Sequence, residues 1–273
     1  MTVEPTVLTS GWEMDRRPVD AVVISSQVTY GAVGNAATVR VLTEAGHRCV
    51  HVPTVILGTL PHYPRLHGGA LPDEWLVGIL DDLLDLDALQ STKYVLVGYL
   101  AHAGQARILA EWFTRLRTRA PHVQLVVDPA MGDDDVGMYT EPAVAESYGV
   151  HLLPLAVGLT PNRFELGLMT DAVVDTAASI EAAALQLLPA GGWVIVTSVD
   201  GSNDGSVGNL IITAEATTPV EHARIETRAK GAGDIFAATV IARLLAGDSV
   251  ARAADVAGSA VAHAIQRAEG LLD

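Results

Sequence analysis

A glycine turn that runs into an acid and an apolar helix is the stretch of this chain best suited to phosphate chemistry. Gly231-Ala232-Gly233 precedes Asp234, and an Ala-rich apolar run continues to about Leu245. Small residues at a helix start leave backbone N–H groups bare, and the helix dipole adds partial positive charge there. The stretch therefore predicts a phosphoryl-transfer site in which Asp234 accepts the proton of an attacking hydroxyl. The alternative is that Asp234 only complements the dipole of an amphipathic helix.

Two further groups of carboxylates follow predicted strands. The predicted strand 123–128 ends on Asp128, and the predicted strand 156–159 is followed by Asn162 and Glu165. Ligands of an open parallel sheet gather beyond the carboxyl ends of its strands, so these acids are well placed for a cation or a phosphate. The three-residue spacing of Asn162 and Glu165 is also that of a helix capping box, and both interpretations of Glu165 stay open.

Short apolar strands alternate with helices along the chain. We expect strands at 21–25, 49–56, 94–98, 123–128, 156–159 and 193–198, helices at 36–45, 75–89, 103–118, 177–188, 234–245 and 250–267, and a hairpin at about 208–214 and 217–227. Strands that are apolar throughout are typical of a parallel sheet covered on both faces. The pattern predicts an α/β fold, a doubly wound, mostly parallel sheet with helices on both faces and no internal repeat.

Domain organisation follows from composition. Residues 1–18 are polar and contain Pro5 and Pro18, which predicts a disordered N-terminal tail before a single domain at 19–273. The connection 58–71 is rich in Pro and Gly and is long for a link between a strand and a helix. Long connections in compact folds often close over ligands, so this one is predicted to be a lid.

Bulk properties restrict the class of partner. The formal net charge of −15 argues against nucleic acid or an anionic membrane as a partner. The single cysteine, Cys49, permits no intrachain disulfide and favours a cytoplasmic protein. No run of eighteen apolar residues and no signal-peptide pattern are present. The nine histidines show no metal-ligand spacing.

Six stretches, taken in order, resemble motifs of the ribokinase-like superfamily, and within it the pyridoxal kinases. They are Ser26-Gln-Val-Thr-Tyr-Gly-Ala-Val-Gly-Asn35, Gly98-Tyr99, Asp128-Pro-Ala-Met-Gly-Asp133, Thr160-Pro-Asn-Arg-Phe-Glu165, Thr197-Ser198 and Gly231-Ala-Gly-Asp234. The last motif alone is typical of the whole superfamily. The first motif, together with Gly98-Tyr99, favours pyridoxal over sugars or hydroxymethylpyrimidine as the substrate.

The resemblance implies a role for each matching position. Asp234 would be the catalytic base, and Gly231, Ala232 and Gly233 the anion hole. The substrate-binding residues would be Ser26 on the pyridine ring, Val33 and Tyr99 on its two faces, and His62 from the lid. The nucleotide-binding residues would be Asp128, Thr160, Asn162, Glu165, Thr197 and Ser198. Asp128 and Glu165 would also hold Mg²⁺, partly through water.

The implied activity is ATP-dependent phosphorylation of the 5'-hydroxymethyl group of pyridoxal, pyridoxine or pyridoxamine in vitamin B6 salvage. ATP would be the co-substrate and Mg²⁺ the metal, the protein would be a homodimer, and a monovalent cation is left open. The chain departs from the family pattern at Gln27 and at Thr59-Leu60-Pro61, where the lid usually carries Asn-His-Thr, and has the unusual cations Arg228 and Lys230. The alternatives are a sister kinase for hydroxymethylpyrimidine, a nucleoside or a sugar, and a binding protein without turnover. Asp234 and its glycine turn argue against the binding protein.

Overall fold

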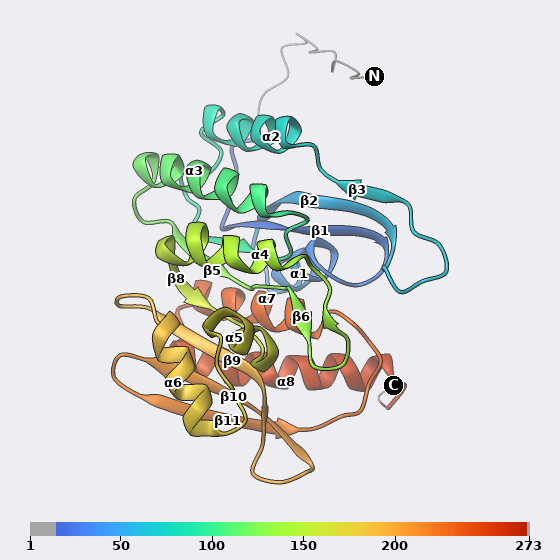
Figure 1. Ribbon diagram of the computed structural model, residues 1–273. Helices are drawn as coiled ribbons and strands as arrows, with labels where there is room; N and C mark the ends of the chain where they lie inside the picture. The colour runs from blue at the N-terminus through green and yellow to red at the C-terminus, as the bar shows by residue number, and fades with distance from the viewer. Residues whose placement is uncertain (1–14, 272–273) are drawn as a thin grey trace.

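In the computed structural model, which describes residues 15–271, nine strands form one twisted sheet (Figure 1). Across the sheet the order is β11 (Thr217–Ala223), β10 (Ser206–Thr213), β9 (Trp193–Asp200), β8 (Ala156–Leu159), β5 (Gln124–Val127), β4 (Tyr94–Val97), β1 (Ala21–Tyr30), β2 (Cys49–Thr59) and β3 (Gly68–Ala70). The strands from β9 to β2 run parallel, and β10, β11 and β3 are antiparallel to their neighbours. The predicted doubly wound α/β fold is confirmed.

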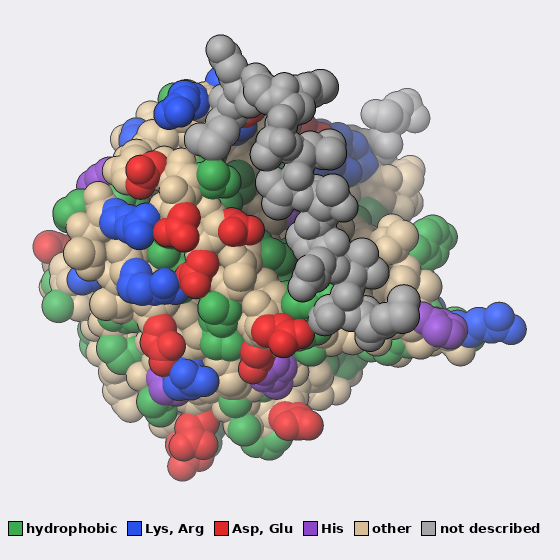
Figure 2. All heavy atoms as spheres, turned by 90° about the horizontal axis from the view of Figure 1, so that it is seen from above, with side chains coloured by type: hydrophobic (Ala, Val, Ile, Leu, Met, Phe, Trp, Pro, Cys, Tyr) green, Lys and Arg blue, Asp and Glu red, His purple; other side chains and the backbone are tan. Residues whose placement is uncertain are grey.

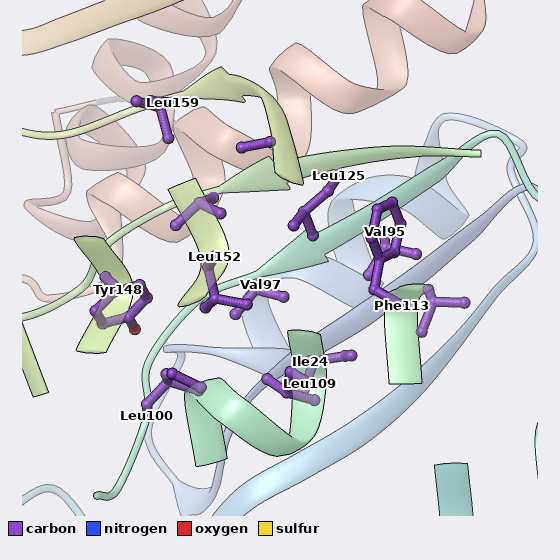
Figure 3. Packing of buried hydrophobic residues seen from close by; sticks show 14 of the residues in the cluster. Ile24, Val95, Val97, Leu100, Leu109, Phe113, Leu125, Tyr148, Leu152 and Leu159 are labelled. Atoms are coloured by element: carbon purple, nitrogen blue, oxygen red, sulfur yellow. The ribbon is translucent and has the colours of Figure 1, made fainter. Parts of the chain in front are cut away.

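Helices cover both faces of this sheet. One face carries α2 (Asp73–Asp85), α3 (Ala103–Arg119), α4 (Pro142–Ser147), α5 (Arg163–Thr170) and α6 (Ala177–Leu187), and the other carries α1 (Asn35–Glu44), α7 (Ala232–Leu245) and α8 (Val250–Ala268). Along β1, Val22 and Ile24 enter the first core, while Ala21 and Val23 enter the second. Figure 3 shows part of the first core, where side chains of the sheet pack on those of α3. Burial on both faces is the reason the strands are apolar throughout.

The segment predicted to be a lid, residues 58–71, is more regular than its composition suggests. β2 continues to Thr59, past its predicted end at 56, and β3 pairs antiparallel with it, so residues 58–71 belong largely to a β-hairpin. Gly68 has a φ of +123°, and a Cβ at this position would lie 2.0 Å from the Ile56 carbonyl oxygen. The hairpin therefore requires a glycine there.

Segment 142–155 carried no predicted element, yet it is helical. α4 is followed by a π-helical turn (Tyr148–Leu152) and a 3₁₀ turn (Leu153–Leu155). Gly149 and Pro154 are poor helix formers, which hides the segment from a propensity argument. Packing explains the helix instead, since Tyr148 and Leu152 are fully buried in the first core (Figure 3).

The predicted N-terminal tail is described only in part. Residues 1–14 of the predicted tail lie outside the described residues, while 15–18 are exposed. No helix within residues 15–271 has the length and hydropathy needed to cross a membrane. Figure 2 shows basic and acidic side chains interspersed on the face formed over α2 and α3, where Arg115 pairs with Asp81 at 2.5 Å. Opposite charges therefore lie close together on this face.

Candidate active site

The glycine turn lies against the loop that follows β1. Gly231 caps α7 in the left-handed region, with a φ of +100°. A Cβ at this position would lie 2.2 Å from the Ala32 carbonyl oxygen, whereas a Cβ at Gly233 would meet nothing within 4 Å. The start of α7 thus touches the 31–34 loop on one side and presents bare backbone to open space on the other. The backbone N–H groups on this open side are the ones predicted to form the anion hole.

Asp234, in the first turn of α7, is partly buried, and the Gly34 backbone amide donates a hydrogen bond to its carboxylate. Burial raises the pKa of Asp234 to about 6, and the Gly34 hydrogen bond offsets part of this rise. A base works best when its pKa lies near the working pH. A pKa raised in this way suits a general base, and the role of Asp234 as the base stays a prediction.

Asp128 follows β5 and belongs to the same site as Asp234. Its Oδ1 accepts a hydrogen bond of 2.7 Å from the Thr160 hydroxyl at the end of β8. Its side chain is buried, and burial together with the negative charge of Asp234 raises its pKa to about 7. The fold thus brings together two carboxylates that are far apart in the sequence, as the strand-end argument predicts.

Glu165 has the structural role that its spacing from Asn162 predicts. The Asn162 side chain accepts from the Glu165 amide at 2.9 Å, and Glu165 Oε2 accepts from the Asn162 amide at 2.9 Å. Glu165 Oε1 also accepts from the Met131 amide at 2.9 Å, which ties the loop after β5 to the start of α5. Burial and the charge of Asp128 nevertheless raise the pKa of Glu165 well above its usual range. The capping box is confirmed, and it sets Glu165 beside Asp128.

This pair of carboxylates suits Mg²⁺ held mainly by phosphates and water. The pKa values of both buried acids are raised, that of Glu165 partly by the charge of Asp128, and a cation between them would relieve this repulsion. Among the described residues, no three His, Cys, Asp or Glu side chains are grouped as a metal cage. Mg²⁺ typically takes one or two carboxylates together with substrate phosphates and keeps several waters. Because both Glu165 oxygens already accept backbone N–H groups, Asp128 is the better direct ligand.

Thr197 and Ser198 lie at an irregularity of β9. The pairing of β9 with β10 shifts register here, and Ser198 has a φ of +58°. The Thr197 amide donates to the Pro161 carbonyl oxygen at 2.9 Å, which joins this strand to the start of α5. Bulges often redirect side chains beside active sites, and this one leaves Ser198 exposed.

The predicted ring-binding residues divide into two groups. Ser26 is buried against Gly34, and no side-chain or backbone group within residues 15–271 hydrogen-bonds its hydroxyl, which leaves the hydroxyl open for a ligand. Val33 Cγ1 would lie 3.5 Å from a Cβ at Gly231. Tyr99 follows β4, and its amide donates to the Ser25 hydroxyl at 3.1 Å. Ser26 and Val33 thus lie beside the glycine turn, and Ser25 connects Tyr99 to the same strand.

His62 is separate from these three residues. It lies exposed on the hairpin tip, and its ring packs edge-on against Tyr63, with centroids 4.7 Å apart. Tyr63 in turn lies 6.0 Å from the ring of Tyr30 at the end of β1. Among the described residues the His62 ring packs on Tyr63, while the Tyr99 ring packs on Tyr139. The role of His62 in ring binding stays a prediction.

Tyr139 is a site residue that the sequence did not reveal. Its ring stacks on Tyr99 with centroids 6.4 Å apart and planes at 25°. The residue is about half exposed, but partial withdrawal of its hydroxyl from water, and then the charges of Glu165, Asp128 and Asp234, raise the pKa of that hydroxyl above the usual range. The acidic turn before it, Asp133-Asp134-Asp135, gives no local signal for a buried contact with Tyr99.

A surface hollow of about 920 Å³ lies elsewhere, lined by residues such as Arg117, Glu146 and Gln186. None of the predicted site residues lines it. Carboxylates with raised pKa values are typical of functional sites. We therefore place the candidate active site at these carboxylates and the glycine turn, and not in this hollow.

Known proteins match both the sequence and the fold. The family model described as phosphomethylpyrimidine kinase matches residues 71–272. A pyridoxine/pyridoxal/pyridoxamine kinase of Bordetella avium is 44% identical over 260 residues, covering 93% of this chain and 88% of the relative. The chain belongs to the pyridoxal kinase family. The predicted resemblance and the predicted kinase class are thereby confirmed.

Solved structures agree with this membership. A pyridoxal kinase of Leishmania donovani in complex with ADP and pyridoxamine has a TM-score of 0.79 and 28% identity, covering 89% of this chain and 83% of that one. A pyridoxal kinase of Entamoeba histolytica has a TM-score of 0.85 at 22% identity, covering 92% of this chain and 90% of that one, and supports the fold.

Proposed function

We propose that this chain transfers the γ-phosphoryl group of ATP to the 5'-hydroxymethyl group of pyridoxal, pyridoxine or pyridoxamine. The observation that carries the proposal is the placement of Asp234. Its carboxylate has a pKa of about 6 and lies at the start of α7, against the 31–34 loop and beside the open glycine turn. Phosphoryl transfer needs a positioned hydroxyl, a base and neutralised charge. The substrate brings the hydroxyl, Asp234 would be the base, and the bare N–H groups of the turn would neutralise charge on the phosphoryl group.

Each group has a separate role. Asp234 removes the proton of the hydroxymethyl group, and the backbone N–H groups of 231–233 bind the transferring phosphoryl group. Ser26 hydrogen-bonds the pyridine ring, while Val33 and Tyr99 cover its faces, an arrangement that gives a flat heteroaromatic both buried area and orientation.

The nucleotide lies across the strand ends on the other side of Asp234. Thr160, Asn162, Thr197 and Ser198 line the path of the triphosphate. Asp128 and Glu165 hold Mg²⁺ against the phosphates, with Glu165 acting through water. The metal neutralises charge on the phosphates when it is bound.

A substrate panel tests this function. Purified protein, ATP and Mg²⁺ are incubated with pyridoxal, pyridoxine, pyridoxamine and 4-amino-5-hydroxymethyl-2-methylpyrimidine, and ADP formation is measured for each. We expect turnover of the B6 vitamers, loss of turnover on adding EDTA, and weaker binding of pyridoxal to Tyr99→Ala than to His62→Ala. Preferred turnover of the pyrimidine would make the chain a sister kinase, and no turnover of any compound would make it a binding protein.

The altered hairpin bears on substrate affinity. Pro61 has no hydroxyl and no backbone N–H to offer the ring. A neutral hydrogen bond contributes on the order of 1 kcal/mol, so we expect moderate rather than absent affinity for pyridoxal. A homodimer, a cytoplasmic location and a monovalent cation stay predictions, to be tested by light scattering, fractionation and K⁺ titration.

A further inference from the structure

The backbone N–H and C=O groups of Gly98 and Tyr99 are all hydrogen-bonded, although β4 has already ended. The Tyr99 amide donates to Ser25 Oγ at 3.1 Å, and its carbonyl oxygen accepts from Thr54 Oγ1 at 2.7 Å. The preceding Gly98 amide donates to the Ile24 carbonyl oxygen at 2.8 Å, and its carbonyl oxygen accepts from the Tyr148 hydroxyl at 2.5 Å. Side chains from β1, β2 and the π-helical turn thus replace the strand neighbours that are missing here.

A second layer holds the first. Gln105 Nε2 on α3 donates to the Thr54 carbonyl oxygen at 2.8 Å, and its Oε1 accepts from the Ala101 amide at 2.9 Å. Asn35 Nδ2 donates to the Ser25 carbonyl oxygen at 3.0 Å. Thr54, Gln105 and Asn35 are fully buried.

Polar side chains are costly in a core unless they are hydrogen-bonded. Ordinary packing would place Val or Leu at these positions, yet the chain has a hydroxyl on β2 and an amide on α3, both aimed at the segment 98–101. Gly98 allows the close approach, since a Cβ there would lie 2.6 Å from Ser25 Oγ. The network therefore fixes the direction in which the backbone leaves β4.

We propose that Thr54 is a positioning residue for substrate binding, acting through Tyr99. By holding the Tyr99 carbonyl oxygen, Thr54 sets the Cα–Cβ direction of Tyr99 and so the plane that its ring offers to the substrate. The inference rests on the proposed contact between Tyr99 and the pyridine ring. It assigns part of the affinity for B6 vitamers to a buried hydroxyl that touches no substrate.

The test compares two buried threonines of the same kind. Thr54→Val removes the hydroxyl that bonds Tyr99. Thr92→Val is the matched control, because Thr92 is equally buried and its hydroxyl donates to the Val19 carbonyl oxygen at 3.1 Å, before the opposite end of β4. We expect Thr54→Val to raise the dissociation constant for pyridoxal about five- to tenfold, while the KM for ATP stays within about twofold. Thr54→Ser, which keeps the hydroxyl, should restore affinity, and Thr92→Val should leave it unchanged.

A double-variant cycle separates this inference from the function beneath it. In a Tyr99→Ala background, Thr54→Val should cause no further loss of pyridoxal affinity, since there is no ring left to position. An equal loss with and without Tyr99 would overturn the positioning role, as would a Thr54→Val affinity matching that of Thr92→Val. If Tyr99→Ala itself leaves pyridoxal binding unchanged, the proposed ring contact is wrong and the positioning role falls with it.

Discussion

Replacing Asp128 by Asn should stabilise the protein without ligands while impairing its activity. Asp128 is buried, its carboxylate accepts one hydrogen bond from Thr160, and no described cation pairs with it. An uncompensated buried charge costs free energy. Asn keeps an oxygen for the Thr160 hydroxyl and removes the charge, so the free energy of unfolding should rise at neutral pH.

The size of the effect follows from the raised pKa. A rise from 3.8 to about 7 is roughly three units, and at 1.36 kcal/mol per unit it corresponds to an upper limit of about 4 kcal/mol. The folded state holds its proton more tightly than the unfolded state, so this part of the stability is present below pH 3.8 and is lost as the pH rises through about 7. The stability gained by Asp128→Asn should therefore be near zero at pH 4 and greatest above pH 7.

Thermal unfolding of the ligand-free protein at several pH values between 4 and 8 measures this difference. The melting temperature of Asp128→Asn should exceed that of the unmodified protein by roughly 5–10 °C at pH 8. Mg²⁺ with ADP should narrow the gap by stabilising the unmodified protein more. If the difference in melting temperature is absent at pH 8, or does not change with pH, the ionised Asp128 side chain does not destabilise the folded protein and the reasoning is refuted.

Three other variants test the remaining parts of the site. Asp234→Asn should lower kcat at least about 100-fold with ADP binding retained, and should abolish the loss of kcat/KM that we expect below pH 6 in the unmodified enzyme, as a pH–rate profile would show. Glu165→Gln should raise the Mg²⁺ concentration needed for half-maximal activity more than it raises the KM for pyridoxal; a lowered melting temperature alone would leave only the capping role. Gly231→Ala should lower kcat/KM at least about tenfold, because its Cβ would clash with Ala32. Gly247→Ala is its control, because Gly247 is also left-handed, with a φ of +91°, and a Cβ there would meet nothing within 4 Å. If both variants lose kcat/KM equally, backbone strain and not the contact with Ala32 causes the loss.

The parts of the fold that depend on local pattern were predictable. The apolar strands and the helices between them have strong periodicity, and most observed bounds lie within a few residues of the predicted ones. The parts that depend on tertiary packing were not. β1 extends to Tyr30, past its predicted end at 25, because pairing with β2 continues through polar residues such as Gln27. The π-helical turn at Tyr148 exists because the tyrosine ring is buried and its hydroxyl reaches Gly98.

The site shows the same division. Acids and glycines that follow strand ends could be found from sequence, because the topology of a parallel sheet brings those ends together. Tyr139 could not, since its position depends on a small hairpin of β6 (Gly132–Asp133) and β7 (Gly137–Met138) that returns the chain to Tyr99. Thr54 and Gln105 lie inside a strand and a helix that look ordinary in the sequence. Their proposed role in positioning Tyr99 follows only from the hydrogen bonds that they make in the folded structure.

The carboxylates Asp128, Glu165 and Asp234 also bear on how a nucleotide with its metal would bind at this site. Their pKa values are all raised, because the fold places them in a corner where negative charge is unfavourable. Binding a cation with phosphates removes part of this repulsion, and the energy released adds to the affinity. It should also lower the pKa of Asp234, because a nearby positive charge favours the ionised form. The base would then be most fully deprotonated when the metal is in place. The acid limb of kcat should therefore lie at lower pH than that of kcat/KM for ATP at saturating pyridoxal, which reports the enzyme before the nucleotide binds.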